Sequence, residues 1–181
     1  MTQTMYAMRR AVRAFLMLVT LLTLAMAFAQ NDDITFDVEV LRVDLVRGDD
    51  GQPTERFMPV EQAFPGEVIE YRVTARNEGD IFFRPGTVVV TLPIGEGAIF
   101  LDGTATPSSR SIITAFSVDG GATFVSMPAP GDDANAAFVE LDASAVTTLR
   151  WTFTTLFSPD QAELLVYRVE IAPLEEPTAA E

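Results

Sequence analysis

The chain has 181 residues, a formal net charge of −14, no histidine and no cysteine, and all 12 of its basic residues are arginines. Without histidine, cysteine or lysine it lacks the usual general bases, thiol nucleophiles and zinc ligands, so the composition predicts a non-enzymatic protein without a bound cofactor. The acidic charge disfavours nucleic acids and anionic lipid surfaces as partners.

The first 29 residues have the pattern of a secretory signal peptide. Three arginines at positions 9, 10 and 13 form a positive n-region, and an apolar run follows over residues 14–29. A membrane-spanning helix needs about 20 apolar residues, and this run is shorter. The segment predicts export to the periplasm, the cell surface or the extracellular space, with no membrane span in the mature protein.

The cleavage site is predicted from the small residues Ala27 and Ala29, which satisfy the Ala-x-Ala rule of signal peptidase. They place the cut between Ala29 and Gln30. An uncleaved N-terminal anchor is the alternative. A twin-arginine signal fits Arg9-Arg10 poorly because the following residues depart from that motif, and the lack of cysteine excludes a lipoprotein signal.

Residues 30–172 are predicted to form one all-β domain, followed by a disordered acidic tail over residues 173–181. Short β-type segments alternate with Gly, Pro, Asn and Asp signals, and only residues 142–146 suggest a single helical turn. Because the chain has no cysteine, a packed core rather than disulfides has to stabilise this domain.

The first predicted strand covers residues 34–47 and changes its pattern halfway. Apolar side chains occupy even positions up to Val40 and odd positions from Leu41 to Leu45. A slip of one residue exchanges the two faces of a strand. The sequence therefore predicts a β-bulge near Val40-Leu41.

The clearest strand lies between the turn Pro65-Gly66 and Asn77, where apolar residues alternate with charged ones, as in a strand with one face in a core. A three-residue hairpin loop is predicted at residues 119–121. The other strands are predicted over residues 87–92, 98–101, 112–118, 122–125, 149–153 and 165–171. Seven to eight such strands predict an immunoglobulin-like antiparallel β-sandwich with Tyr71 and Trp151 in its core.

Several short motifs follow one another in a characteristic order. They are Pro-Gly-Glu-Val-Ile-Glu-Tyr-Arg-Val-Thr-Ala-Arg-Asn-Glu-Gly at residues 65–79, Val-Val-Val-Thr-Leu-Pro at 88–93, Gly-Thr-Ala-Thr-Pro at 103–107 and Ser-Val-Asp-Gly-Gly at 117–121, with closing strands around 149–151 and 166–169. In this order they resemble the conserved-repeat module of bacterial surface proteins, domain of unknown function eleven.

The resemblance covers residues 60–172. It implies an immunoglobulin-like, extracytoplasmic module of envelope, adhesin-like or surface-layer-associated proteins, and it implies no catalytic residues. The chain departs from the family in having a single module, an added strand over residues 34–47 and no recognisable C-terminal anchor. It also has Pro159-Asp160 where the family often has Pro-Gly.

Two non-catalytic functions stay open. The leading hypothesis is a structural or protein-interaction module of the bacterial cell envelope that binds envelope or surface proteins through free sheet edges. The alternative is a carbohydrate- or polymer-binding sandwich, which needs an exposed aromatic patch drawn from Phe82, Phe83, Trp151 and Tyr167. Because adjacent strand residues face opposite ways, one of Phe82 and Phe83 is expected to be exposed. Core positions are expected for Phe100, Phe116, Phe124 and Phe138.

Acidic side chains give two further alternatives. The pairs Asp32-Asp33, Asp49-Asp50 and Asp132-Asp133 have oxygens that suit Ca²⁺, but none has the spacing of a known calcium loop. Solvated loop charge is predicted instead, and no metal site. A secreted hydrolase needs two carboxyl groups about 5–10 Å apart in a cleft, whereas most acids here fall in loops or at outward strand positions.

Overall fold

The structure is a computed structural model that describes residues 33–127 and 142–173. The predicted signal peptide with Ala27 and Ala29, the pair Asp132-Asp133, Phe138 and the tail beyond Pro173 lie outside these residues. Within them, no helix is long and apolar enough to cross a membrane.

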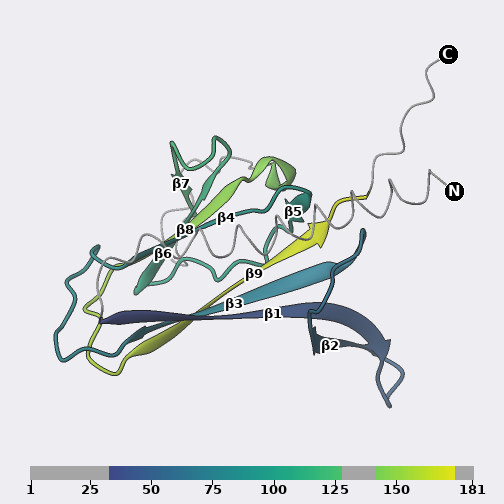
Figure 1. Cartoon of the computed structure of the whole chain (residues 1–181), viewed down its shortest axis with the longest axis horizontal. Helices are drawn as coiled ribbons and strands as arrows, with labels where there is room; N and C mark the ends of the chain where they lie inside the picture. The colour runs from purple at the N-terminus through teal and green to yellow at the C-terminus, as the bar shows by residue number, and fades with distance from the viewer. Residues whose placement is uncertain (1–32, 128–141, 174–181) are drawn as a thin grey trace, which may run out of the picture.

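Two antiparallel sheets pack against each other, which confirms the predicted all-β sandwich (Figure 1). The five-stranded sheet has the order β2-β1-β3-β9-β5, and the four-stranded sheet has the order β4-β8-β6-β7. The strands are β1 (Ile34–Arg47), β2 (Pro53–Pro59), β3 (Val68–Asn77), β4 (Val89–Pro93), β5 (Ala98–Phe100), β6 (Ile112–Ser117), β7 (Val125–Ser126), β8 (Thr148–Phe153) and β9 (Ala162–Ile171). The predicted helical turn is the 3-10 helix η2 (Ala143–Ala145), capped by the Asp142 side chain.

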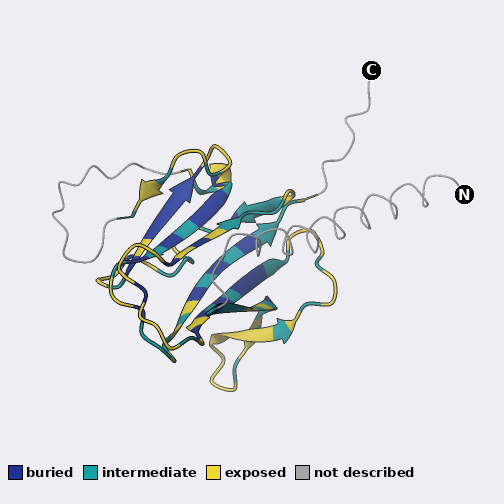
Figure 2. Cartoon of the chain, turned by 60° about the vertical axis from the view of Figure 1, so that its left-hand side comes forward, coloured by how far each residue is buried: buried dark blue, intermediate teal, exposed yellow. Residues whose placement is uncertain are grey.

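The core lies between the facing sheets, where alternate residues of β3, β8 and β9 are buried (Figure 2). Trp151 is fully buried, and the rings of Tyr71 and Tyr167 stack with centroids 4.8 Å apart. Burial raises the pKa of Tyr71 to about 12, so its phenol stays neutral in the core. The predicted core positions of Tyr71 and Trp151 are confirmed.

Asn77, at the end of β3, holds together two loops at one end of the sandwich. Its Nδ2 donates hydrogen bonds to the carbonyl oxygens of Ile81 and Phe157 at 2.8 and 3.2 Å. Its Oδ1 accepts from the N–H of Gly79. Since the amide is fully buried, these partners satisfy groups that would otherwise be costly to desolvate. They explain why β3 ends here, as predicted.

The β-bulge predicted near Val40-Leu41 is wrong. The pairing of β1 with β3 runs without interruption, with Val40 opposite Tyr71 and Leu41 opposite Glu70. The apolar side chains shift from even to odd positions because the second part of β1 buries side chains on its opposite face. Val40 packs against the core between the sheets, whereas Leu41, only 5% exposed, is buried on the outer face of the five-stranded sheet.

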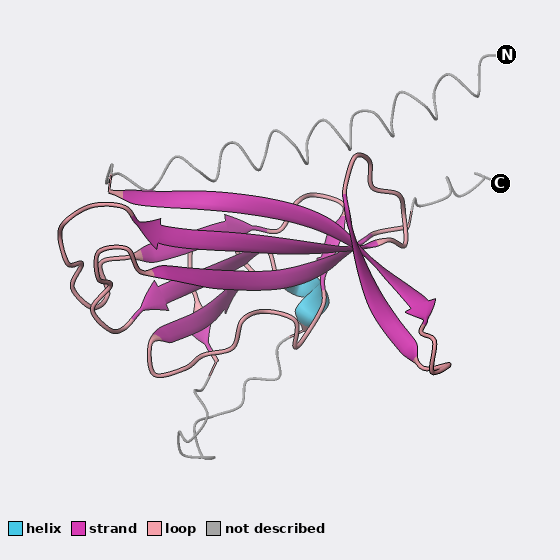
Figure 3. Cartoon of the chain, turned by 90° about the horizontal axis from the view of Figure 1, so that it is seen from below, coloured by secondary structure: helices cyan, strands magenta, loops and turns pink. Residues whose placement is uncertain are grey.

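Over residues 33–127 and 142–173 the sandwich has nine strands rather than seven to eight, because β2 is an additional strand. Pairing of β1 with β3 stops at Val43, and β1 continues to Arg47 with β2 as its only neighbour. We call residues 44–59 the arm. Figure 3 shows the arm turning away from the direction of the other strands. Its β2 side chains are almost all exposed (Figure 2).

The predicted three-residue hairpin loop between β6 and β7 is also wrong. β7 is shorter than expected, and the last pair of the hairpin is Phe116 with Val125. The Asp119 carboxylate organises the longer loop by accepting hydrogen bonds from the Ser117 hydroxyl and from the N–H and hydroxyl of Thr123. These bonds lower the pKa of Asp119 to about 2. The side chain thus replaces the expected ladder bonds.

Candidate functional site: a groove beside the arm

The aromatic residues proposed for a ligand platform separate into one exposed and three buried side chains. Phe82 is 63% exposed, while Phe83, Trp151 and Tyr167 are buried. The expectation that one of Phe82 and Phe83 is exposed is confirmed. Phe83 instead pairs with Phe157 in an isolated β-bridge, which fixes its loop to the sandwich.

The other phenylalanines mostly fill the core as expected. Phe100 and Phe116 are buried and in contact, with ring centroids 5.4 Å apart. Phe124 is different: it is half-buried, and the Arg150 guanidinium stacks over its ring at 3.8 Å. No flat aromatic platform therefore forms around Phe82 from the phenylalanines that the structure places.

Of the residues in the proposed acidic pairs, the structure describes Asp33, Asp49 and Asp50, whereas Asp32 lies outside the described residues. The Asp50 carboxylate accepts the N–H of Gln52 at 3.0 Å and so closes the turn of the arm. Asp33 lies beside Gly79, where its backbone carbonyl accepts the N–H of Glu78. Over residues 33–127 and 142–173, no three acidic side chains come together in a group that suits a metal ion.

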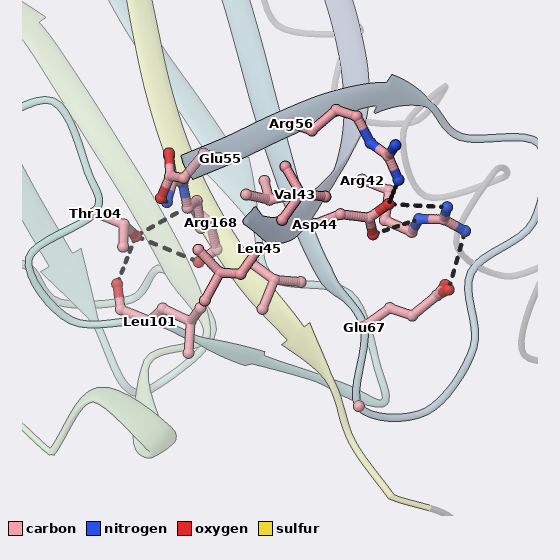
Figure 4. A pocket seen from close by; sticks show the side chains of 13 residues that line it. Arg42, Val43, Asp44, Leu45, Glu55, Arg56, Glu67, Leu101, Thr104 and Arg168 are labelled. Carbon is pink, nitrogen blue, oxygen red and sulfur yellow. Dashed lines mark hydrogen bonds and ion pairs between the residues drawn. The ribbon is translucent and has the colours of Figure 1, made fainter. Parts of the chain in front are cut away.

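A groove of about 570 Å³ opens between the arm and the body of the sandwich (Figure 4). One wall consists of Val43 of β1 and of the arm, including Leu45. The other consists of residues 66–68 where the chain enters β3, Leu101 and Thr104 after β5, and Arg168 of β9. The groove thus combines segments from both ends of the chain, and none of its residues was singled out as a site by the sequence.

The arm is fastened to the sheet by a network around the buried carboxylate of Glu70. Both oxygens of Glu55 accept from Arg168, at 2.6 and 2.7 Å. The Nε of Arg168 also donates to Glu70 at 2.7 Å, as does the Nε of Arg72. The Arg72 guanidinium lies 4.6 Å from the ring centroid of Phe57. Strand β2 is therefore held over the outer face of the sheet by charge and by cation–π contact.

A second set of ion pairs closes the opposite rim of the groove. The Arg42 guanidinium contacts Glu67 at 3.2 Å and Asp44 at 3.2 Å, and Arg56 also donates to Asp44 at 3.1 Å. Hydrogen bonds from Arg56 and Arg42 lower the pKa of Asp44, and those from Arg168 lower the pKa of Glu55. Neither carboxyl has the raised pKa that a general acid needs.

The backbone of β1 has an open edge along the groove. The bonds from Val60 N–H to the Val40 carbonyl and from Gly48 N–H to the Gln52 carbonyl flank the β1–β2 ladder. Because antiparallel bonding alternates, even residues of β1 bond to β2, and Leu45 and Arg47 point the other way. Beyond Val43, β3 no longer runs beside β1 on that side. Within the described residues, the backbone N–H and C=O groups of Leu45 and Arg47 therefore have no partner.

Other edges are open as well, but they lack a groove. The outer edge of β2 offers the N–H groups of only Glu55 and Phe57, because Pro53 and Pro59 have none. By the same alternation, the N–H groups of Val89 and Thr91 point outward from the free edge of β4. The first part of β1 is also open on the side away from β3, since β2 covers only residues 41–47.

Comparisons with protein-family models, curated proteins and solved structures give no match to this chain. The resemblance to the bacterial conserved-repeat module therefore stays an expectation. The structure bears on one difference from that module, which often has glycine at the position of Asp160. Asp160 has a φ of 61°, in the left-handed region that glycine adopts without strain. Asp is among the few other residues that adopt this region readily.

Proposed function

We propose that this protein is an exported, non-enzymatic interaction module of the bacterial cell envelope, immunoglobulin-like in fold, which binds other proteins by accepting their strands. The observation that carries the proposal is the unpaired backbone of Leu45 and Arg47 beside a groove. An open edge of this kind recognises an extended segment through main-chain hydrogen bonds. The absence of histidine, cysteine and lysine supports a non-catalytic role.

Export is tested by fractionating the producing cells and determining the N-terminus of the mature protein by mass spectrometry. We expect the protein in the envelope or medium with Gln30 as its first residue. A protein recovered from the cytoplasm with its first 29 residues intact would contradict the proposal.

Binding through edges is tested with a photo-crosslinking amino acid at single positions in the producing cells. We expect crosslinks from Leu45 or from Val89 at the β4 edge, both of which are exposed. Thr123 is a matched control, because it is exposed but lies in the β6–β7 loop. Crosslinks of equal yield from Thr123, or none from either edge position, would contradict binding through sheet edges.

The carbohydrate-binding alternative has less support. Three of the four aromatic residues it needs are buried, and the residue that precedes Phe82, Ile81, is an exposed aliphatic one. Sugar rings stack on aromatic faces, and a single phenylalanine offers little area for that. Binding of the purified protein to envelope polysaccharide that is lost on Phe82→Ala would restore this alternative.

A further inference from the structure

We propose that the groove beside the arm binds a short, extended, uncharged peptide segment with apolar side chains, supplied by another protein, which pairs with Leu45 and Arg47. This rests on the proposed function and names the site and the chemistry of the partner. The segment would occupy the place that β3 leaves open beyond Val43. It would add a strand between the arm and residues 66–68.

The length of the segment follows from the overhang of β1. The last β1–β3 pair is Val43 with Val68, and β1 ends four positions later at Arg47. Leu45 and Arg47 each offer one donor and one acceptor toward the groove, enough for two hydrogen-bonded positions. A strand rises about 3.3 Å per residue, so a segment of about four or five residues spans this edge. A groove of about 570 Å³ is of a size to hold it.

The apolar character of the segment follows from the side chains that meet it. Leu45 is 75% exposed, more than any other large apolar side chain among the described residues. In Figure 4 the Leu45 side chain projects into the groove near Leu101, and Val43 also lines the groove. Covering these side chains removes apolar surface from water, which is the main favourable term in association.

The lack of charge on the segment follows from the ion pairs around the groove. Each of Arg42, Arg56 and Arg168 already contacts a carboxylate, and Asp44, Glu55 and Glu67 are those carboxylates. A charged side chain that entered would be desolvated and would find no unpaired charge among the residues that line the groove, or would have to break one of these pairs. The net charge of −14 disfavours acidic segments further.

The test is a nuclear magnetic resonance titration of the protein as purified after export. The probe is the peptide acetyl-Ser-Val-Thr-Val-Ser-amide. We expect saturable shifts of the backbone amides of Leu45, Arg47 and Leu101. The same peptide with both valines replaced by glutamate, or with both valine nitrogens methylated, is expected to bind at least tenfold more weakly.

A pair of matched variants distinguishes binding in the groove from non-specific hydrophobic binding. Leu45→Asp is expected to weaken binding of the valine peptide at least tenfold. Val118→Asp is the control, because Val118 is a similarly apolar residue, 51% exposed, at the β6–β7 loop outside the groove. It is expected to leave the affinity unchanged. Equal losses in both variants would overturn the proposal.

Other outcomes would overturn this inference in distinguishable ways. Shifts confined to Val89 and Thr91, or to the open first part of β1, would move the binding site to another edge and leave the proposed function standing. Concentration-dependent shifts of Leu45 and Arg47 without peptide would make a second copy of the chain the occupant. Absence of saturable shifts overturns the inference as well, and the crosslinking experiment then decides independently whether edges are used at all.

Discussion

The two halves of β1 use the same alternating pattern for opposite purposes. From Ile34 to Val40 the strand is paired on one side with β3, and its even side chains pack toward the core between the sheets. From Leu41 onward it is also paired with β2 on the other side, and its odd side chains lie on the outer face. A change in apolar phase can therefore report a change of covering neighbour rather than a slip in the backbone.

The largest expected effect comes from the shared core that the first half of β1 helps to cover. Trp151→Ala should lower the free energy of unfolding by about 3–5 kcal/mol, because it removes a fully buried ring and leaves a cavity. Chemical denaturation measures the loss, and Val118→Ala is the control for an exposed apolar residue. An unchanged midpoint for Trp151→Ala would contradict its core placement.

The next effect tests whether the second half of β1 has a buried surface of its own. Leu41→Ala should cost about 2–3 kcal/mol, since Leu41 is only 5% exposed although it lies on the outer face, where it is paired with Pro59 of the arm. Denaturation of this variant is compared with that of Leu45→Ala, which should change stability by less than about 0.5 kcal/mol. Equal effects would mean that the arm does not cover Leu41 in solution.

A smaller effect is expected at Glu70, where the arm network meets the sheet. Glu70→Gln should cost about 1–3 kcal/mol, because two arginine Nε atoms lose a charged acceptor. The interaction with the arm is isolated by a double-mutant cycle with Glu55→Gln. Additive losses would show that the two carboxylates do not act through Arg168 together.

The smallest effect on global stability is expected for Glu55→Gln. The main consequence of this substitution should be a local loosening of the arm. The Glu55 side chain is 40% exposed and that of Arg168 is 22% exposed, so the pair is open to solvent screening and Glu55→Gln should cost at most about 1 kcal/mol. Backbone amides of residues 44–59 should exchange with solvent faster, while those of β8 keep their protection. Faster exchange across the whole sandwich would contradict a role confined to fastening the arm.

The same pair predicts a pH dependence of the arm. Hydrogen bonds from Arg168 lower the pKa of Glu55, so its contribution is fully present above the ordinary glutamate pKa of about 4.3. It is lost as the pH falls through the lowered value in the folded protein. The protection factors of the arm amides, which are exchange rates corrected for the intrinsic pH dependence of amide exchange, should therefore fall between about pH 6 and about pH 3, and Glu55→Gln should flatten this change.

The parts of the fold that could be predicted were those with one buried face. The alternation around Tyr71 and Trp151 reports burial directly, because only one sheet face meets the core. Strand β2 could not be predicted, since Pro53, Pro59 and its charged residues are typical of a loop and its pairing depends on β1. The two prolines are tolerated because β2 is an edge.

The groove could not be predicted from the sequence for a different reason. It exists because β1 extends to Arg47, four residues beyond its last pair with β3, which begins at Val68. No local sequence pattern encodes this difference in the extent of the two strands. Its fastening depends on Arg168 and Glu55, which are 113 residues apart. The only local signal was the continued alternation to Leu45, a large apolar residue on a segment with no core to face.

The position of β9 has a consequence for the order in which the molecule assembles. Among the described residues β9 is the last strand in the sequence, yet it lies inside the five-stranded sheet between β3 and β5. A chain that emerges from its N-terminus can pair β1 with β2 and β3 early, but its sheet stays incomplete until the last residues arrive. Such non-local pairing slows folding. Arg168 arrives with that strand, so its ion pair with Glu55 can form only after β9 has joined the sheet.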